Sequence, residues 1–339
     1  MNAHHLALDP SADNAFVGSV EQRLAELLEA HHPGAEDRSA IADEAAGYLT
    51  RASSAKRARP RLVHQFGAAL DVESDAMVNM ASAAELIHTA SLLHDDVVDD
   101  ATTRRGRQAA NVRWGNQVAI LGGDLLLCHS LKLLEGYPIR VYHSAVDVIM
   151  EMTRGIVREV EARFDSATSL GAWQHIAMGK TAALLGWCGY APAMIAEKPE
   201  LAERFDRCGR HLGIAFQLAD DLKDLLDADT GKDRFADIRN GNPSYPLLWA
   251  ADADDEIRAM LDDAWGAEAP VGDADEVERI GEAVLRSDAV GQTVEVVDHE
   301  IAQALSALGA AGDRPGGRQV RSWAKMLLGS VEYLARDCA

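Results

Sequence analysis

The hydrophobic residues of this chain recur every three or four positions, which is the period of an α-helix. The period predicts helices over most of the length. The longer ones are expected over residues 16–31, 37–52, 59–71, 75–100, 116–136, 139–164, 169–196, 199–227 and 319–336, with shorter ones between 246 and 310. We find no alternating pattern long enough to predict a strand, no heptads, no repeats and no low-complexity tract. The expected fold is all-α, a single large helical bundle that spans residues 1–339.

Two long polar segments interrupt the helical pattern, over residues 101–115 and 228–245. Each directly follows a helix that ends in a group of carboxylates. Segments of this length in a compact helical protein are more often functional than not, so both are expected to be active-site loops that close over a ligand. The polar segment at residues 1–15 is expected to be flexible, and it lacks the apolar core of a signal peptide.

Composition narrows the possible partners. The chain has 33 Lys and Arg residues against 54 Asp and Glu residues, and the resulting net charge of −21 argues against general binding of nucleic acid or anionic lipid. The cysteines show no Cys-x-x-Cys spacing, so neither a zinc site nor a disulfide framework is expected, and a reducing cytoplasm fits. The longest apolar stretch, residues 181–196, is shorter than the ~20 residues that span a bilayer and is expected to be a buried helix.

Acidic residues gather where the helix expected over residues 75–100 ends. They are Asp95, Asp96, Asp99 and Asp100, and Arg104 and Arg105 follow them. The helical period places Asp95 and Asp99 on one face, one turn apart. Like charges at this spacing repel each other, so we expect a compensating cation, and a hard divalent ion prefers oxygen ligands.

A second group of carboxylates repeats this spacing. It consists of Asp220, Asp221 and Asp224, again after an apolar run. Either group alone is more often a solvated helix end. Two groups with identical spacing on separate helices indicate two carboxylate faces that meet across a bundle, with metal ions between them. The planar fork of arginine matches phosphate oxygens, so metals and arginines together indicate a magnesium-bridged phosphate or diphosphate.

With these motifs the chain resembles the trans-isoprenyl diphosphate synthases, or polyprenyl synthetases, from about residue 56 to residue 246 and more weakly to the C-terminus. The resemblance implies a bundle of the isoprenoid synthase type with a central substrate cavity, a homodimer, and Mg²⁺ as cofactor, with Mn²⁺ as an alternative and roughly three ions per site. It also implies the reaction, which joins isopentenyl diphosphate head-to-tail to an allylic diphosphate. The allylic diphosphate ionises, the isopentenyl double bond attacks the cation, and the released diphosphate accepts the proton.

The resemblance also implies roles for single residues. The residues implied to be catalytic are Asp95, Asp96, Asp99, Arg104, Lys180, Asp220 and Asp221. Those implied to bind metal are Asp95, Asp99, Asp220 and Asp224. Substrate binding falls on Lys56, Arg59, His88, Arg104, Arg105, Lys180, Thr181, Gln217 and Lys232. Without the resemblance, a lone histidine in an apolar helix is more often a core residue, and a lysine at a helix start is ordinarily solvated.

The chain departs from the family pattern at two places. The family has Gly-Gly before the basic turn that contains Lys56 and Arg59, whereas this chain has Ser54 and Ala55. In the second loop the family has a lysine where this chain has Asn242, which carries no charge. Either Arg234 or Arg239 compensates for the lost charge, or diphosphate binding is weaker, or the activity is altered.

Product length depends on the turn before Asp95, since the growing tail should pass down this helix. In short-chain relatives an aromatic residue blocks the tail here, whereas Ala90 and Ser91 are small, so the expected product is C20 or longer. Two other functions stay open. One is a regulatory or non-catalytic subunit of a heteromeric synthase. The other is a class I terpene cyclase, which the regular second aspartate motif and the 5% aromatic content disfavour.

Overall fold

The computed structural model describes residues 10–29, 40–50, 57–226 and 234–337, and almost all of them are helical. The part before residue 163 contains α1 (Pro10–Glu29), α2 (Ala40–Thr50), α3 (Ala58–Ala68), α4 (Ser74–Val98), β1 (Thr103–Arg104), β2 (Arg107–Gln108), α5 (Ala110–Trp114), α6 (Asn116–Leu133) and α7 (Ile139–Ala162). The rest contains α8 (Leu170–Ala177), η1 (Met178–Ala182), α9 (Ala183–Ile195), α10 (Pro199–Leu226), α11 (Ala236–Asn240), α12 (Tyr245–Ala253), α13 (Asp255–Trp265), α14 (Ala274–Arg286), α15 (Ala289–Leu308), η2 (Gly309–Asp313) and α16 (Pro315–Asp337).

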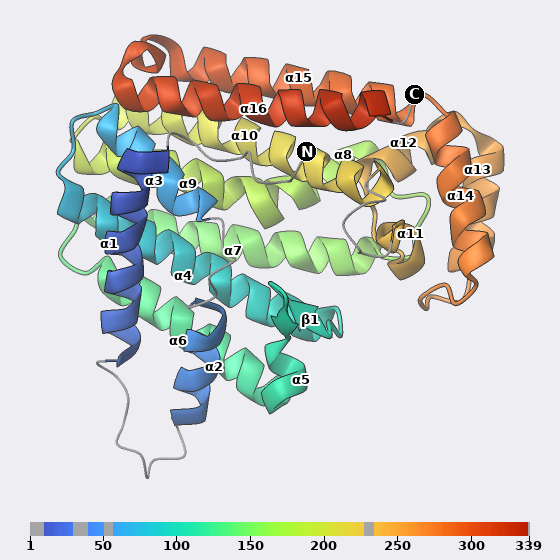
Figure 1. The fold of residues 1–339 in the computed structure, drawn as a ribbon, viewed down its shortest axis with the longest axis horizontal. Helices are drawn as coiled ribbons and strands as arrows, with labels where there is room; N and C mark the ends of the chain where they lie inside the picture. Colours follow the sequence, from blue (N-terminus) through green and yellow to red (C-terminus); the bar gives the residue numbers. More distant parts are fainter. Residues whose placement is uncertain (1–9, 30–39, 51–56, 227–233, 338–339) are drawn as a thin grey trace.

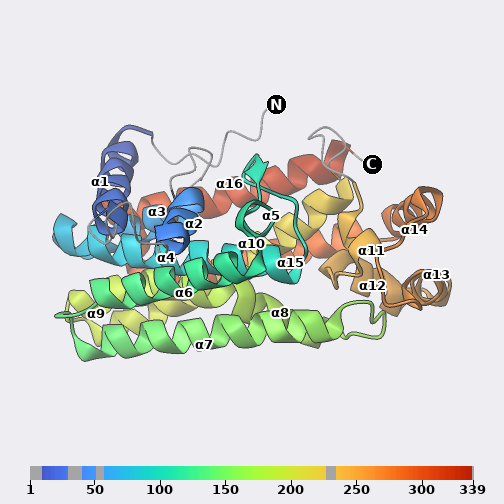
Figure 2. The same ribbon diagram turned by 90° about the horizontal axis from the view of Figure 1, so that it is seen from below.

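Helices α4 and α10, the two that carry the aspartates, lie in the middle of the bundle. Helix α4 packs against α3, α6 and α9, and α10 packs against α9 and α15. Figure 1 shows α15 and α16 along the top of the bundle, and α13 and α14 as a separate pair at its right-hand end. Viewed from below, α6 and α7 lie side by side on an outer face (Figure 2). The expected all-α bundle is thereby confirmed.

Most of the apolar stretch at residues 181–196 forms α9, which lies inside the bundle as predicted. Eleven of its residues are buried. Glycines allow α10 to approach it closely, because a Cβ atom at Gly209 would lie 2.1 Å from the backbone oxygen of Leu185. No helix in the described ranges is both long and apolar enough to cross a membrane.

The helix expected over residues 169–196 is interrupted, which the periodicity did not show. Residues Met178–Ala182 form a π-helical turn, η1, between α8 and α9. There the backbone of α7 comes very close, since a Cβ at Gly179 would lie 2.8 Å from the backbone oxygen of Glu151. Single π turns inside helices are frequent at functional sites, and this one contains Lys180 and Thr181.

The two polar segments contain more regular structure than expected. In the first, β1 and β2 pair as a hairpin whose turn residues Arg105 and Gly106 both have positive φ, and α5 follows. The expectation of no strand therefore fails for these two short strands, which are too brief for alternation to predict. The second segment forms α11 in its described part. Residues 10–15, expected to be flexible, form the first turns of α1.

Candidate active site

The first aspartate cluster lies at the C-terminal end of α4, and Asp95 is its half-buried member. Burial raises the pKa of Asp95 to about 6; Lys180 opposes this shift, whereas Glu159 adds to it. Asp99, one turn later, is exposed and accepts a hydrogen bond from Arg163 at the end of α7, with 2.5 Å between Nη2 and Oδ1. The raised pKa means that the negative charge of Asp95 is incompletely compensated here, so a bound cation would stabilise it.

Asp96 points into the protein and anchors the hairpin. It is fully buried, and Arg104 donates from Nε to Asp96 Oδ1 over 2.5 Å. Asn111 on α5 donates to the backbone oxygen of Asp96. The other carboxylate oxygen of Asp96 is buried and finds no hydrogen-bond partner among the described residues. Arg104, predicted to bind diphosphate, is therefore paired with Asp96 in this structure.

A group of arginines surrounds His88, two turns before Asp95. Arg57 forms an ion pair of 2.5 Å with the buried Glu85, and Arg105 approaches the same carboxylate at 3.6 Å. Arg59 has a buried Nε without a partner in the described part of the chain, and burial lowers its pKa. Burial also lowers the pKa of His88 well below its ordinary value, and Arg59 and Arg105 lower it further. His88 is thus neutral within a cationic cluster that favours an anionic ligand.

Lys180 lies on the π turn and faces α7. Its Nζ donates to both carboxylate oxygens of Glu159, at 2.7 and 2.6 Å. Burial alone would lower the pKa of Lys180, but Glu159 and Asp95 outweigh this effect and raise the pKa above its usual value. The next residue, Thr181, donates from its hydroxyl to Gln217 on α10 over 2.8 Å. Three predicted residues, Lys180, Thr181 and Gln217, therefore lie within one continuous set of contacts.

Asp221 is the buried member of the second cluster, at the C-terminal end of α10. Its Oδ1 accepts from Gln217 at 3.0 Å, and its Oδ2 accepts from the Trp173 indole at 3.0 Å and from the Tyr245 backbone N–H at 2.9 Å. Trp173 and Tyr245 also contact each other edge to face, with ring centroids 5.0 Å apart. Burial raises the pKa of Asp221 to about 7, although all three donors oppose the shift. Asp221 therefore joins α8, α10 and α12.

The other two aspartates of this cluster differ from each other. Asp220 is exposed and lies 3.1 Å from Lys223. Asp224 accepts backbone N–H groups of Ala236 and Asp237 on separate oxygens, at 3.1 and 3.0 Å, and thereby fixes the start of α11. Metal binding by Asp224 stays a prediction, and its observed contacts hold the second loop.

The two clusters border one region of the protein. Lys180 is close enough to Asp95 of the first cluster and to Asp237 beside the second to influence the pKa of both. The pKa of Arg59 is in turn raised by Asp220 and lowered by Arg105. In Figure 1 the ends of α4 and α10 lie toward the same end of the bundle. The carboxylates and the cations are therefore arranged around a shared site.

At the departure from the family pattern, Asn242 turns toward Asp237. Its Nδ2 donates to Asp237 Oδ1 over 3.2 Å. Arg234, one of the two arginines expected to compensate, instead lies 3.5 Å from Glu278 on α14 and stacks on Phe235. In this structure the charge of Arg234 is directed toward α14, and compensation by Arg239 stays a prediction.

Sequence reasoning missed three residues of this site: Glu159, Arg163 and Trp173. Glu159 and Arg163 are four positions apart at the end of α7, on the side that faces the first cluster. That spacing was a usable signal, but charges on an amphipathic helix are usually solvated. Trp173 gave no signal, because an indole on an apolar helix reads as a core residue. Two predicted residues, Lys56 and Lys232, lie outside the described residues.

The donor set suits a hard divalent cation, although the protein does not chelate one alone. Within the described ranges, no three His, Cys, Asp or Glu side chains lie close enough together to hold a metal ion. Asp95, Asp99 and Asp220 present carboxylate oxygens at the site, and the burial of Asp95 leaves negative charge to compensate. A Mg²⁺ ion usually keeps several waters and takes substrate phosphate oxygens, so this sparse donor set fits it.

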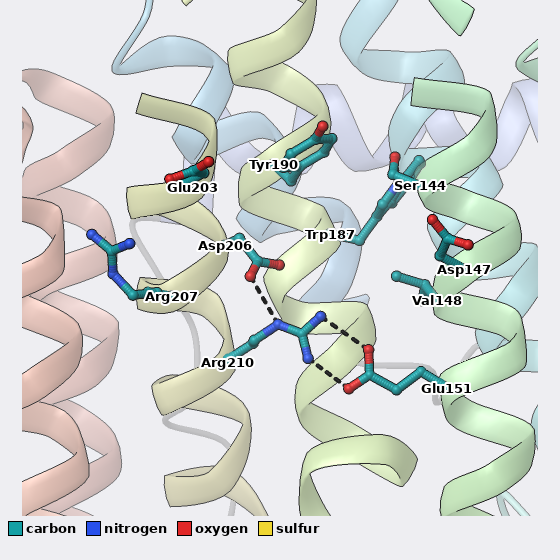
Figure 3. A pocket seen from close by; sticks show the side chains of 10 residues that line it. All are labelled: Ser144, Asp147, Val148, Glu151, Trp187, Tyr190, Glu203, Asp206, Arg207 and Arg210. Atoms are coloured by element: carbon teal, nitrogen blue, oxygen red, sulfur yellow. Dashed lines mark hydrogen bonds and ion pairs between the residues drawn. The ribbon is translucent and has the colours of Figure 1, made fainter. Parts of the chain in front are cut away.

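A cavity of about 450 Å³ lies elsewhere, between α7, α9 and α10 (Figure 3). Arg210 spans it and forms ion pairs with Glu151 at 2.7 Å and Asp206 at 2.8 Å. None of the predicted site residues lines this cavity. Its side chains are thus separate from the aspartate clusters.

Comparison with known proteins identifies the family. The model of the polyprenyl synthetase family matches residues 39–284, so the chain belongs to this family and is a prenyltransferase. The heptaprenyl diphosphate synthase component 2 of Geobacillus stearothermophilus is 32% identical over 273 residues, which cover 78% of this chain and 82% of the relative. The nonaprenyl diphosphate synthase of Mycobacterium tuberculosis is 33% identical over 272 residues, covering 78% and 79%.

Solved structures show the same fold. A decaprenyl diphosphate synthase from Rhodobacter capsulatus aligns with a TM-score of 0.84 at 27% identity, over 94% of this chain and 97% of the other. A polyprenyl synthase from Caulobacter crescentus CB15, complexed with calcium and isoprenyl diphosphate, aligns with a TM-score of 0.81 at 27% identity, over 93% and 94%. The predicted family and the isoprenoid synthase type of bundle are confirmed.

Proposed function

We propose that this chain is a trans-polyprenyl diphosphate synthase that condenses isopentenyl diphosphate head-to-tail with an allylic diphosphate and makes products of C20 or longer. The observation that carries the proposal is the shared site: two aspartate clusters from α4 and α10 border one region, with a cationic group beside it. Repeated condensation needs two diphosphates held next to each other, and this site offers metal ligands and arginines for both.

The aspartates and Lys180 serve the allylic diphosphate in this proposal. Asp95, Asp99 and Asp220 would hold magnesium ions, with Asp224 beside them. When bound, magnesium supplies Lewis-acid stabilisation of the leaving diphosphate. Glu159 already holds the ammonium group of Lys180 at the site, so this positive charge is preorganised to stabilise the diphosphate.

The arginine group around His88 serves isopentenyl diphosphate. Arg59 has an N–H without a partner among the described residues, and a phosphate oxygen would satisfy it. His88 is neutral and can donate one N–H. The released diphosphate accepts the proton from the product, so the site needs no protein base.

The direct test is turnover by the purified single chain with Mg²⁺, isopentenyl diphosphate and farnesyl diphosphate. We expect longer prenyl diphosphates, detected by chromatography. Hydrocarbon products would instead identify a cyclase. A second candidate function is a subunit of a heteromeric synthase, which Asn242 and the "component 2" name of the Geobacillus relative favour. Absence of turnover by the chain alone would support that candidate and contradict ours.

Product length gives a further prediction. Ala90 is fully buried on α4, and Ser91 is half-buried with its hydroxyl bonded to the backbone oxygen of His88. Two relatives are named as hepta- and nonaprenyl synthases, which fits a long product. We expect Ala90→Phe to shorten the product, measured by the chain length of the extracted prenyl alcohols. Ser144→Ala on α7 is the control, and an unchanged product spectrum in Ala90→Phe would exclude Ala90 from the tail path.

We also propose a homodimer in the cytoplasm. Six of the exposed large apolar side chains belong to α6 and α7, the two helices that lie side by side in Figure 2: Ile120, Leu121, Ile139, Met150, Val157 and Val160. Apolar surface of this kind on a soluble fold usually marks a contact with another chain. Light scattering should give twice the chain mass, and Leu121→Glu should halve it. A monomeric wild type would contradict this proposal.

A further inference from the structure

Arg163 occupies a position that connects both halves of the site. It ends α7, and its Nη2 donates to Asp99 of the first cluster over 2.5 Å. The next residue, Phe164, donates its backbone N–H to the carbonyl oxygen of Gly241 in the second loop over 2.8 Å. Phe164 and Gly241 both have positive φ, and the Phe164 ring packs directly on the Gly241 backbone. The backbone of Arg163 is therefore fixed between the first cluster and the second loop.

The guanidinium of Arg163 has donors to spare. An arginine carries five N–H groups in a fixed fork, which matches phosphate oxygens. Asp99 occupies Nη2, whereas the Nε of Arg163 is buried and has no hydrogen-bond partner among the described residues. The side chain is 22% exposed, so it is partly removed from water yet accessible to a ligand. The exposed part of the guanidinium can donate to an anion, and one charged hydrogen bond there would favour binding.

The backbone at Arg163 lies close to Asn242, an uncharged residue of the second loop. Asn242 follows the Gly241 that Phe164 contacts, and its side chain donates to Asp237. Arg163 precedes Phe164 and Asn242 follows Gly241, so both residues adjoin the backbone hydrogen bond between Phe164 and Gly241. Arg234 is directed away from this position, toward Glu278 and Glu282. Together with Lys180, which also acts on Asp99, Arg163 places a second positive charge beside this carboxylate.

We propose that Arg163 is a diphosphate-binding residue that supplies, from the end of α7, the positive charge that Asn242 does not supply from the second loop. The inference rests on the proposed function in taking a diphosphate as the ligand. An alternative role is purely structural, in which Arg163 only joins α7 to Asp99.

The test is a calorimetric titration of the full chain with inorganic diphosphate in the presence of Mg²⁺. We expect Arg163→Gln to weaken binding about tenfold, the scale of one charged hydrogen bond. We expect Asn242→Lys in the same chain to restore binding to within about threefold of wild type. This rescue supports a direct role for Arg163 when Asn242→Lys leaves the binding of the otherwise wild-type chain unchanged. Arg286→Gln is the matched control, because Arg286 also ends a helix and pairs with a glutamate, Glu282.

The outcomes separate the two roles. Unchanged binding in Arg163→Gln, or a loss that Asn242→Lys does not restore, would overturn the inference. If Asn242→Lys alone perturbs binding, the comparison of Arg163→Lys with Arg163→Gln decides, since the lysine keeps the charge. Equal losses in these two variants would then overturn it. Turnover by the wild type tests the proposed function separately, so an active wild type with an unaffected Arg163→Gln would refute this inference alone.

Discussion

The two aspartate clusters share one spacing, but the protein supports them in different ways. In the first, the second aspartate, Asp96, is held by the charged side chain of Arg104. In the second, the equivalent Asp221 is held by an indole, an amide side chain and a backbone N–H. The first is thus a charged pair at a hairpin, and the second is a buried carboxyl group held by uncharged donors between helices. Identical motifs therefore do not imply identical roles for their members.

The first aspartates of the two clusters, Asp95 and Asp220, differ in how deeply they are buried. Asp95 is half-buried and its pKa is raised to about 6, whereas Asp220 is exposed beside Lys223. A half-buried carboxylate costs stability unless a cation compensates it. The comparison indicates that the first cluster depends more strongly on bound metal, whereas the second provides the rigid wall of the site. Three substitutions test this difference.

The largest effect is expected for Asp95→Asn. Removing this carboxylate should lower kcat by at least about 100-fold, the scale of losing one preorganised electrostatic group. Stability should stay the same or rise slightly, because the variant no longer buries a charge whose pKa is raised. Steady-state kinetics and thermal unfolding measure the two effects. Activity within tenfold of wild type would show that Asp95 is not central.

A loss of stability is expected next, for Asp221→Ala. The substitution leaves three buried donors without their acceptor, from Trp173, Gln217 and the Tyr245 backbone, and should cost about 3 kcal/mol of unfolding free energy. The control is Asp220→Ala, which removes an exposed carboxylate and should change stability by about 0.5 kcal/mol or less while lowering activity. Similar urea midpoints for both variants would contradict the comparison.

The smallest effect is expected for Trp173→Phe. Phenylalanine keeps the edge-to-face contact with Tyr245 but loses the indole N–H, which should cost about 1 kcal/mol. Trp323→Phe is a matched control, since Trp323 is also buried and its indole donates to no residue in the described ranges. Equal destabilisation of both variants in urea would mean that the bond to Asp221 contributes nothing measurable.

Much of the fold was predictable because the helical period extends over long segments. The bounds of α4, α7 and α10 follow the predicted ranges closely. The interruption at η1 was not predictable, because it depends on the close approach of Gly155 to Gly179 from another helix. The hairpin of β1 and β2 was missed because two-residue strands are too short for any alternation.

The sequence could predict candidate site residues that belong to a motif, but not the residues that support them through packing. The spacing and the resemblance predict the aspartates and Lys180 as site residues, and the structure places Lys180 close enough to Asp95 and Asp99 for both to raise its pKa. Their supports, Glu159 and Trp173, come from helices far away in sequence, so only packing reveals them. The sequence also did not predict that Asp220 is exposed and Asp221 is buried, because the Asp-Asp spacing does not distinguish the two carboxylates.

The central claim is that both aspartate clusters bind the same metal-bound diphosphate. Calorimetric titration with inorganic diphosphate and Mg²⁺ tests it most directly, on wild type, Asp95→Asn and Asp220→Asn. The account predicts that wild type binds, that EDTA abolishes binding, and that each variant weakens it by at least about tenfold. Wild-type affinity in either variant would show that one cluster binds the diphosphate alone, and would contradict the account.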